Sequence, residues 1–158
     1  MKTLVIYASA YGNTAKIANA VCMSLSEYGE SAVKQVDEFV KRDMDDLDIL
    51  VIGSPTQGGK PTKPAQQFID QLPIKLLKQT KVAIFDTRFE ASKQKLGMRL
   101  LMRIIGYAAT KMAKRIKQRG GRVLLAPKGF MVSGTEGPLE RGELEEAGAW
   151  AAQLVSGS

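Results

Sequence analysis

The sequence predicts an α/β domain: a doubly wound five-stranded parallel sheet of order 2-1-3-4-5 within a three-layer sandwich. Two observations support this fold class. Short apolar runs rich in β-branched residues alternate with segments whose apolar residues have helical spacing, which is typical of a parallel sheet covered on both faces. In addition, a hydroxyl-rich turn at residues 9–14 separates the first strand-like run from the first helical run, where such sheets bind ligands.

Strands are expected where a short apolar run lies between turn residues. Lys2–Tyr7 is short and β-branched, and residues 48–53 form a continuous apolar run that suits a central parallel strand. The other expected strands are residues 31–36, 81–86 and 122–126, and residues 130–132 can extend the last of them after Pro127.

The expected helices have apolar residues three or four positions apart. The first, residues 15–25, buries one face, and a short helix follows at residues 64–72. For the last helix, residues 139–155, the spacing predicts that Glu143, Glu145 and Glu146 face water and that the core-facing residues are Leu144, Ala147, Ala151 and Leu154.

The composition favours one domain, residues 1–158, whose chemistry comes from a cofactor. The chain has no histidine and one cysteine, which excludes an internal disulfide, a thiolate metal cage and the commonest general base. No apolar run approaches the roughly 18 residues of a membrane span, and the run before Ala8 is too short for a signal peptide. We therefore expect a cytoplasmic protein.

The turn from Ser9 to Thr14 is a candidate anion site. A turn between a strand and a helix brings backbone N–H groups and the positive end of a helix dipole to one point. Hydroxyl, amide and backbone donors are available from Ser9, Ala10, Tyr11, Gly12, Asn13 and Thr14. The Gly-Lys-Ser/Thr ending of a P-loop is missing from this turn.

The run from Val5 to Val21 resembles the flavodoxin signature at each of its eight constrained positions within 17 residues. Gly53-Ser54-Pro55-Thr56 and the order of the elements extend the resemblance over nearly the whole chain. The resemblance implies that the chain binds FMN non-covalently, with the phosphate on residues 9–14, and that it transfers single electrons.

The resemblance also implies that residues 54–59 lie along one edge of the isoalloxazine ring, where Pro55, Thr56 and Gln57 pack against it or hydrogen-bond to it. Gly58 and Gly59 would let a peptide turn over and offer a carbonyl to the N5–H of the reduced ring, because glycine reaches positive φ cheaply. This is how the family is thought to stabilise the neutral semiquinone. The other interpretation of the two glycines is a plain turn.

The segment Asp86-Thr87-Arg88-Phe89 is implied to meet the pyrimidine edge of the flavin. Phe89 is the candidate for stacking on the ring, with Tyr11 as a second one, because residues 54–60 contain no aromatic; Phe89 could equally be a core residue. A guanidinium near flavin N1 or O2 would favour the anionic hydroquinone, so we hypothesise that Arg88 raises the second reduction potential. The alternative is a solvated Arg88 that pairs with a surface acid.

The net charge of +7 is concentrated in one basic segment. Residues 88–122 contain 11 Lys and Arg and one acid, Glu90, and so carry +10, which leaves −3 for the rest. From Leu96 to Ile116 the apolar residues have helical spacing, and Gly97 and Gly106 can divide the run into two helices. The part at about 88–110 is longer than the usual loop after the fourth strand of the family.

Three interpretations of the basic segment stay open. It can be a core-facing helix with a solvated cationic face, a docking surface for a redox partner protein that is acidic there, or a peripheral membrane contact. The membrane contact would use Arg99, Arg103 and the apolar residues Met98, Leu101, Met102 and Ile105. We expect no nucleic-acid binding, because Tyr107 is the only aromatic residue available for stacking.

The resemblance thus predicts an FMN-binding carrier of single electrons between redox proteins, with no catalytic residue of its own. The alternative is an FMN-dependent quinone or porphyrinogen reductase of the same fold, associated with a membrane through the basic segment. A phosphoacceptor receiver domain is excluded, because Tyr7-Ala8 and Gly53-Ser54 stand where that class needs acids.

Overall fold

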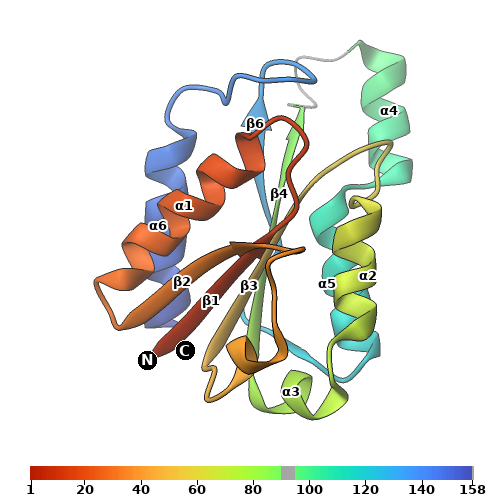
Figure 1. Cartoon of the computed structure of the whole chain (residues 1–158). Helices are drawn as coiled ribbons and strands as arrows, with labels where there is room; N and C mark the ends of the chain where they lie inside the picture. Colours follow the sequence, from red (N-terminus) through yellow and green to blue (C-terminus); the bar gives the residue numbers. More distant parts are fainter. Residues whose placement is uncertain (90–94, 158) are drawn as a thin grey trace.

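The computed structural model describes residues 1–89 and 95–157 and, within them, every side chain except that of Met102. Its centre is a parallel sheet with strand order β2-β1-β3-β4-β5, which confirms the predicted order (Figure 1). A further strand, β6, pairs with β4. The strands are β1 Lys2–Tyr7, β2 Glu30–Gln35, β3 Ile49–Pro55, β4 Lys81–Phe89, β5 Arg122–Val123 and β6 Lys128–Val132.

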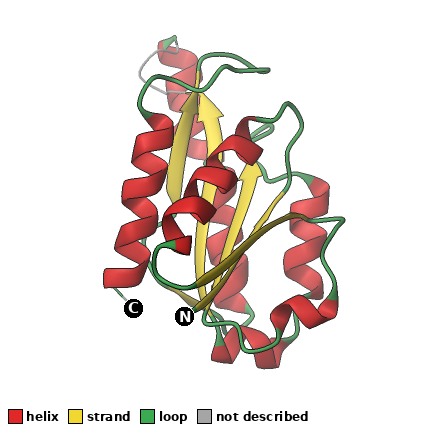
Figure 2. Cartoon of the chain, turned by 60° about the vertical axis from the view of Figure 1, so that its left-hand side comes forward, coloured by secondary structure: helices red, strands yellow, loops and turns green. Residues whose placement is uncertain are grey.

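Helices cover both faces of the sheet (Figure 2). On one face lie α1 (Asn13–Ser26) and α6 (Glu143–Ser156). On the other face lie α2 (Lys63–Gln71), α3 (Ile74–Gln79) and α5 (Ala108–Gln118). A 3₁₀ helix, η1 (Lys41–Met44), precedes β3, and α4 (Leu96–Ile105) precedes α5. Each face of the sheet therefore has its own apolar core, as a doubly wound fold requires.

Three aromatic rings form the centre of the core beneath α6. Phe85 of β4, Phe130 of β6 and Trp150 of α6 pack edge to face, with ring centroids 5.7–6.1 Å apart. The prediction that Leu144 faces this core is wrong, because it lies in the first turn of α6 and is 45% exposed. Glu143 in the same turn accepts a hydrogen bond from the backbone N–H of Met131 at 2.9 Å, so it does not simply face water.

Strand β4 is longer than the sequence predicted. It continues through Phe89 because β3 pairs with it as far as Thr87 and β6 pairs with it as far as Phe89. Residues 87–89, expected in a loop, are therefore held in a sheet, which fixes the direction of each side chain.

The strand expected at residues 122–126 is interrupted. Strand β5 has only two residues, and pairing with β4 resumes at Lys128, after Pro127. Proline has no N–H to donate and therefore breaks the hydrogen-bond ladder of a strand. The interruption makes β6 a separate strand whose carboxyl end lies beside that of β4, at the carboxyl-terminal edge of the sheet.

Gly106, at φ 77°, divides the basic segment into α4 and α5 as the sequence allowed. In α5 the apolar residues Ala108, Met112 and Ile116 are at most 1% exposed, which confirms a core-facing helix there. In α4 the apolar residues have the same spacing but are not buried: Leu96, Leu100 and Ile104 are 58–79% exposed. The core-facing interpretation is wrong for α4. Glu90 and its neighbours to residue 94 lie outside the described residues.

Candidate functional site

The loop between β1 and α1 presents backbone N–H groups that can donate hydrogen bonds to a ligand. Ser9 Oγ accepts the Gly12 N–H at 3.0 Å, and Gly12 has φ 89°, a left-handed conformation that favours glycine. No side chain among the described residues caps α1, and its first turn contains no acid. Within residues 1–89 and 95–157 no acceptor meets the backbone N–H groups of Ala10, Tyr11, Asn13 and Thr14.

Two polar side chains of this loop tie it to other elements. The Asn13 side-chain amide donates to the backbone carbonyl of Glu136 at 3.1 Å. The Thr14 and Thr87 hydroxyls lie 2.9 Å apart in a buried position. Because that pair has two O–H protons and uses one between its members, one proton is left to donate to a ligand. The loop is thus fixed in place by contacts with β4 and with the segment after β6.

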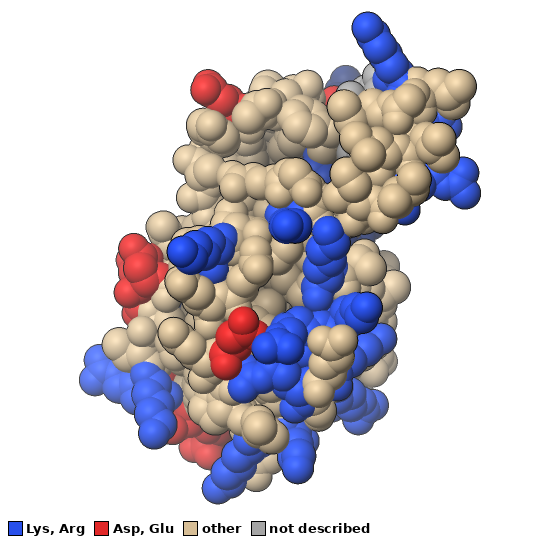
Figure 3. Space-filling model, turned by 90° about the vertical axis from the view of Figure 1, so that its right-hand side faces the viewer, with Lys and Arg blue, Asp and Glu red and all other residues tan. Residues whose placement is uncertain are grey.

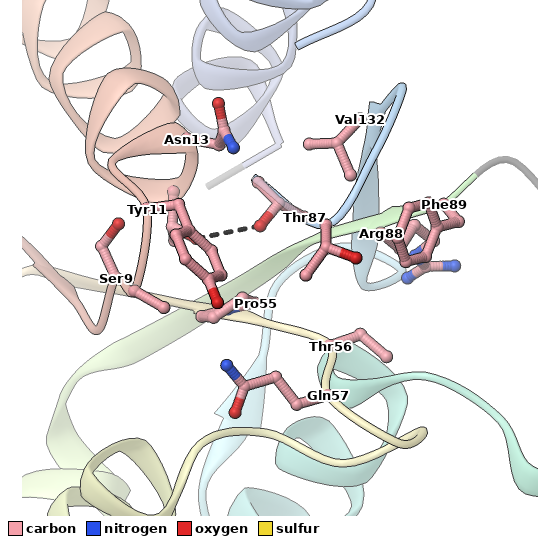
Figure 4. Close-up of a pocket in the computed structure, with 13 residues that line it drawn as sticks. Ser9, Tyr11, Asn13, Pro55, Thr56, Gln57, Thr87, Arg88, Phe89 and Val132 are labelled. Atoms are coloured by element: carbon pink, nitrogen blue, oxygen red, sulfur yellow. Dashed lines mark hydrogen bonds between the residues drawn. The ribbon is translucent and has the colours of Figure 1, made fainter. Parts of the chain in front are cut away.

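A shallow groove runs from this loop across the ends of β3 and β4 (Figure 4). In the figure, Ser9 and Tyr11 line one side, Arg88 and Phe89 the opposite side, and Pro55, Thr56 and Gln57 a third. Its volume is about 60 Å³. The lining residues are Ser9, Ala10, Tyr11, Asn13, Thr14, Pro55, Thr56, Gln57, Thr87, Arg88, Phe89, Val132 and Thr135.

Two of the lining residues, Val132 and Thr135, were not predicted. They come from the end of β6 and the segment after it, which approaches the first loop through the Asn13–Glu136 hydrogen bond. The sequence carried a signal for them. Residues 130–132 were expected to extend the strand next to β4. Because the carboxyl ends of parallel strands meet at one edge of a sheet, residues at and after the end of this extension could have been placed near the groove.

Four predicted residues do not line the groove. Gly12 lies within the loop and shapes it. Gly58 and Gly59 line a neighbouring cavity instead, between the turn after β3 and helix α4. Asp86 is 0% exposed, so its carboxylate lies beneath the groove.

Asp86 and Arg88 form a bidentate ion pair on one side of the groove. Arg88 Nε lies 2.5 Å from Asp86 Oδ1, and Arg88 Nη2 lies 2.9 Å from Oδ2. The guanidinium also stacks on Tyr107, with Cζ 3.7 Å from the ring centroid. Arg88 is therefore neither a solvated side chain nor the partner of a surface acid. Its charge is largely balanced before any ligand arrives.

Burial raises the pKa of the Asp86 carboxyl above its usual value. Arg88, the Ala109 N–H and the Thr56 hydroxyl act in the opposite direction, because they stabilise the carboxylate. The Ala109 N–H donates to Oδ2 at 2.8 Å and the Thr56 hydroxyl at 3.1 Å. Asp86 thereby connects β4, the turn after β3 and the start of α5 beneath the groove.

The donors of the first loop fit a phosphate ester. Four backbone N–H groups, one hydroxyl proton and the positive end of α1 can neutralise an anion without a lysine in the loop. Within the described part of the chain, no three His, Cys, Asp or Glu residues gather in a way that could hold a metal ion. The site therefore has the character of an anion site next to a partly apolar groove.

Comparison with known proteins shows the family to which the chain belongs. The family model of the flavodoxin domain matches residues 4–132. A diflavin flavoprotein (A 5) of Nostoc sp. is 42% identical over 65 residues, 37% of this chain and 11% of that protein. The flavodoxin-like domain-containing protein BilS of Clostridioides difficile is 31% identical over 106 residues, 66% of this chain and 56% of that protein. The matched segments thus span only part of both relatives.

Solved flavodoxin structures share the fold over nearly their whole length. A flavodoxin from the domain Archaea superposes with a TM-score of 0.77 at 19% identity, covering 99% of this chain and 97% of that one. Oxidised flavodoxin 1 from Bacillus cereus gives a TM-score of 0.73 at 19% identity, covering 99% and 98%. Since the family model covers most of the chain and the topology agrees, this protein belongs to the flavodoxin family, whose members bind flavin.

Proposed function

We propose that this protein binds FMN and carries single electrons between redox proteins. The observation that carries the proposal is the set of four backbone N–H groups just before and at the start of α1 that meet no acceptor within the described residues. They open onto the groove across β3 and β4. The phosphate of FMN can accept hydrogen bonds from these N–H groups, and its planar ring can lie in the groove. FMN supplies one-electron redox chemistry when bound. The chain itself would bind and orient the ring.

The groove offers contacts for a ring at its edges and over one face. Pro55 ends β3, and Thr56 and Gln57 follow it. Phe89 and the 55% exposed Tyr11 are the aromatic side chains that line the groove. Because the groove is open to solvent and its volume is only about 60 Å³, much of a bound ring would stay accessible to a partner. Such exposure suits electron transfer over short distances.

Gly58 and Gly59 keep their proposed role in tuning the redox states. Both already have positive φ, 55° and 73°. A peptide between two such residues can turn over at low conformational cost, which would let its carbonyl or its N–H face the ring.

Reconstitution tests this proposal. The purified full-length chain, mixed with FMN, should quench flavin fluorescence with 1:1 stoichiometry, and riboflavin, which lacks the phosphate, should bind far more weakly. Stepwise reduction with dithionite should then show a stable one-electron-reduced form. Equal affinity for the two flavins would rule out the phosphate site, and direct two-electron reduction would rule out the carrier.

We propose that the partner protein is acidic at its docking face. Figure 3 shows Lys and Arg side chains gathered on the α5 side of the molecule. Lys114 and Lys117 of α5 and Arg99 and Arg103 of α4 are exposed. Cations of this kind steer an acidic partner, so association should slow steeply with added salt.

A peripheral membrane contact is the alternative use of this surface. No helix within the described residues is long and apolar enough to span a bilayer. Leu96, Leu100 and Ile104 form an exposed stripe on α4, next to Arg99 and Arg103. Such a stripe could enter the interface of an anionic membrane. Sedimentation with phosphatidylglycerol vesicles but not with phosphatidylcholine vesicles would favour this alternative; a cytoplasmic location is checked by cell fractionation.

A reductase acting on a quinone or porphyrinogen is the second candidate function. The cavity that adjoins the groove favours it, because a carrier has no need of a substrate pocket. Steady turnover of NAD(P)H with a quinone by the FMN-loaded protein would support the reductase. Stable one-electron reduction without turnover would support the carrier.

A further inference from the structure

A second cavity lies beside the groove, between α4 and the turn after β3. Its volume is about 380 Å³, within the range of roughly 300–1,000 Å³ that is usual for small-molecule sites. Its walls are mostly apolar. The residues that line it are Thr56, Gly58, Gly59, Arg88, Phe89, Met98, Leu101, Ile105, Gly106 and Tyr107.

Two glycines make this arrangement possible. A Cβ on Gly59 would collide with the side chain of Ile105, so the bare backbone of the turn lets the end of α4 approach it. A Cβ on Gly129 of β6 would collide with the Arg88 guanidinium, so Gly129 leaves the room in which the guanidinium lies. The walls therefore depend on close contacts between elements far apart in the sequence.

The cavity and the groove share a wall. Thr56, Arg88 and Phe89 line both. A molecule in the cavity would thus lie on the other side of these three residues from a ligand in the groove. The ion pair with Asp86 and the stacking on Tyr107 hold Arg88 in this wall.

The wall provides few polar groups. Arg88 uses Nε and Nη2 for Asp86, and within the described residues its Nη1 has no acceptor. The Thr56 hydroxyl is already engaged, since it donates to Asp86 and accepts from the Ala108 N–H at 2.9 Å. Because Asp86 balances the charge of Arg88, a neutral acceptor oxygen fits the guanidinium N–H groups that have no acceptor among the described residues better than an anion does.

We propose that this cavity binds a small, largely apolar molecule that carries a carbonyl oxygen, with the oxygen accepting from Arg88. Binding itself needs only the cavity. The ligand's role as a redox substrate rests on the proposed FMN site in the groove, since the two sites share a wall.

A fluorescent naphthyl ketone, Prodan, is a suitable probe because its emission shifts to the blue in apolar surroundings. The full-length protein should bind Prodan with a blue shift, with and without added FMN. The same naphthylamine without its ketone should bind about tenfold more weakly, a difference of about 1.4 kcal/mol. No blue shift with the wild-type protein overturns the proposal, and equal affinity for both probes overturns the role of the carbonyl.

Two adjacent residues of α4 provide a matched pair of variants. Leu101 and its neighbour Leu100 are 45% and 58% exposed, but only Leu101 of the two lines the cavity. Leu101→Trp should fill the cavity and weaken Prodan binding at least about tenfold, while Leu100→Trp should leave it unchanged. Equal loss in both variants, or loss in neither, would show that Prodan adheres to the surface of α4 and would overturn the proposal.

Flavin binding is measured separately in the same samples. FMN affinity, from quenching of flavin fluorescence, should be unchanged in both variants. If Prodan binds and FMN does not, the proposed function fails while the cavity site stands. If FMN binds and Prodan does not, the cavity proposal fails while the FMN site stands.

Discussion

The Arg88 guanidinium holds the fully buried Asp86 carboxylate through two hydrogen bonds, of 2.5 Å and 2.9 Å. The two residues are next-but-one neighbours on β4, so their side chains lie on the same face of the sheet. This pair forms part of the wall between the groove and the neighbouring cavity. Its integrity therefore affects folding and both candidate sites.

Removing one partner of this pair should be strongly destabilising. Arg88→Gln leaves a buried carboxylate without its cation and should lower the free energy of unfolding by about 3–5 kcal/mol. The double variant Asp86→Asn with Arg88→Gln should lose less, because no buried charge is left uncompensated. Urea denaturation of the three proteins measures both values. An equal or larger loss in the double variant would contradict this account.

The charge of Arg88 should also set the second reduction potential of bound FMN. Asp86→Asn leaves the guanidinium unbalanced beside the groove, which favours an anionic reduced flavin. The second potential should rise by on the order of 30–60 mV, where 59 mV corresponds to a tenfold change for one electron. Dithionite titration with a reference dye measures it. Unchanged potentials in both Asp86→Asn and Arg88→Gln would refute the hypothesis.

The two glycines of the turn after β3 should respond differently to alanine. Gly58 has space for a Cβ, so Gly58→Ala costs only the strain of its positive φ, about 1 kcal/mol. At Gly59 a Cβ would also collide with Ile105, so Gly59→Ala should cost more and displace α4. Thermal unfolding ranks the two variants. If the turn tunes the flavin as proposed, Gly58→Ala should also lower the first reduction potential.

The exposed stripe of α4 should contribute little to stability. Replacing Leu96, Leu100 and Ile104 together by Ser should change the free energy of unfolding by less than about 1 kcal/mol, because these side chains are already 58–79% exposed. Ile116 of α5, 0% exposed, is the control, and Ile116→Ala should cost about 2–5 kcal/mol. Loss of vesicle or partner binding in the triple variant alone would identify the stripe as a contact surface.

Asp43 should give the protein a pH-dependent stability. Although burial acts to raise its pKa, hydrogen bonds from Lys34 and the Val40 N–H, with the charges of Lys34 and Arg42, lower it below its usual value of 3.8. A lowered pKa stabilises the fold above the usual value, and this contribution disappears as the pH falls through the pKa of the folded state.

The variant Asp43→Asn should therefore lose about 1 kcal/mol at pH 7 and progressively less as the pH falls below 3.8. The Lys34–Asp43 distance of 2.8 Å is the contact that is lost. Urea denaturation at several pH values, with the exposed Asp37→Asn as control, tests this. A loss that does not depend on pH would point to packing instead of charge.

The sequence by itself determined the order of the strands and the place of the anion loop. Both depend on local patterns, because apolar periodicity distinguishes strand from helix and the residues of the loop are contiguous. The eleven groove residues that were predicted lie at or just after the carboxyl ends of strands β1, β3 and β4, which must meet at one edge in this topology.

Only the tertiary structure decided which neighbours each side chain has. The helical spacing of Leu96 and Leu100 in α4 is like that of Met112 and Ile116 in α5, yet only α5 lies on the sheet and buries its residues. Arg88 looked like a free cation beside a ligand until the fold showed it paired with Asp86. The periodicity of apolar residues predicts which side chains prefer burial. Whether they are buried, and which charges pair, depends on contacts between segments that are distant in the sequence, and a local pattern does not contain those contacts.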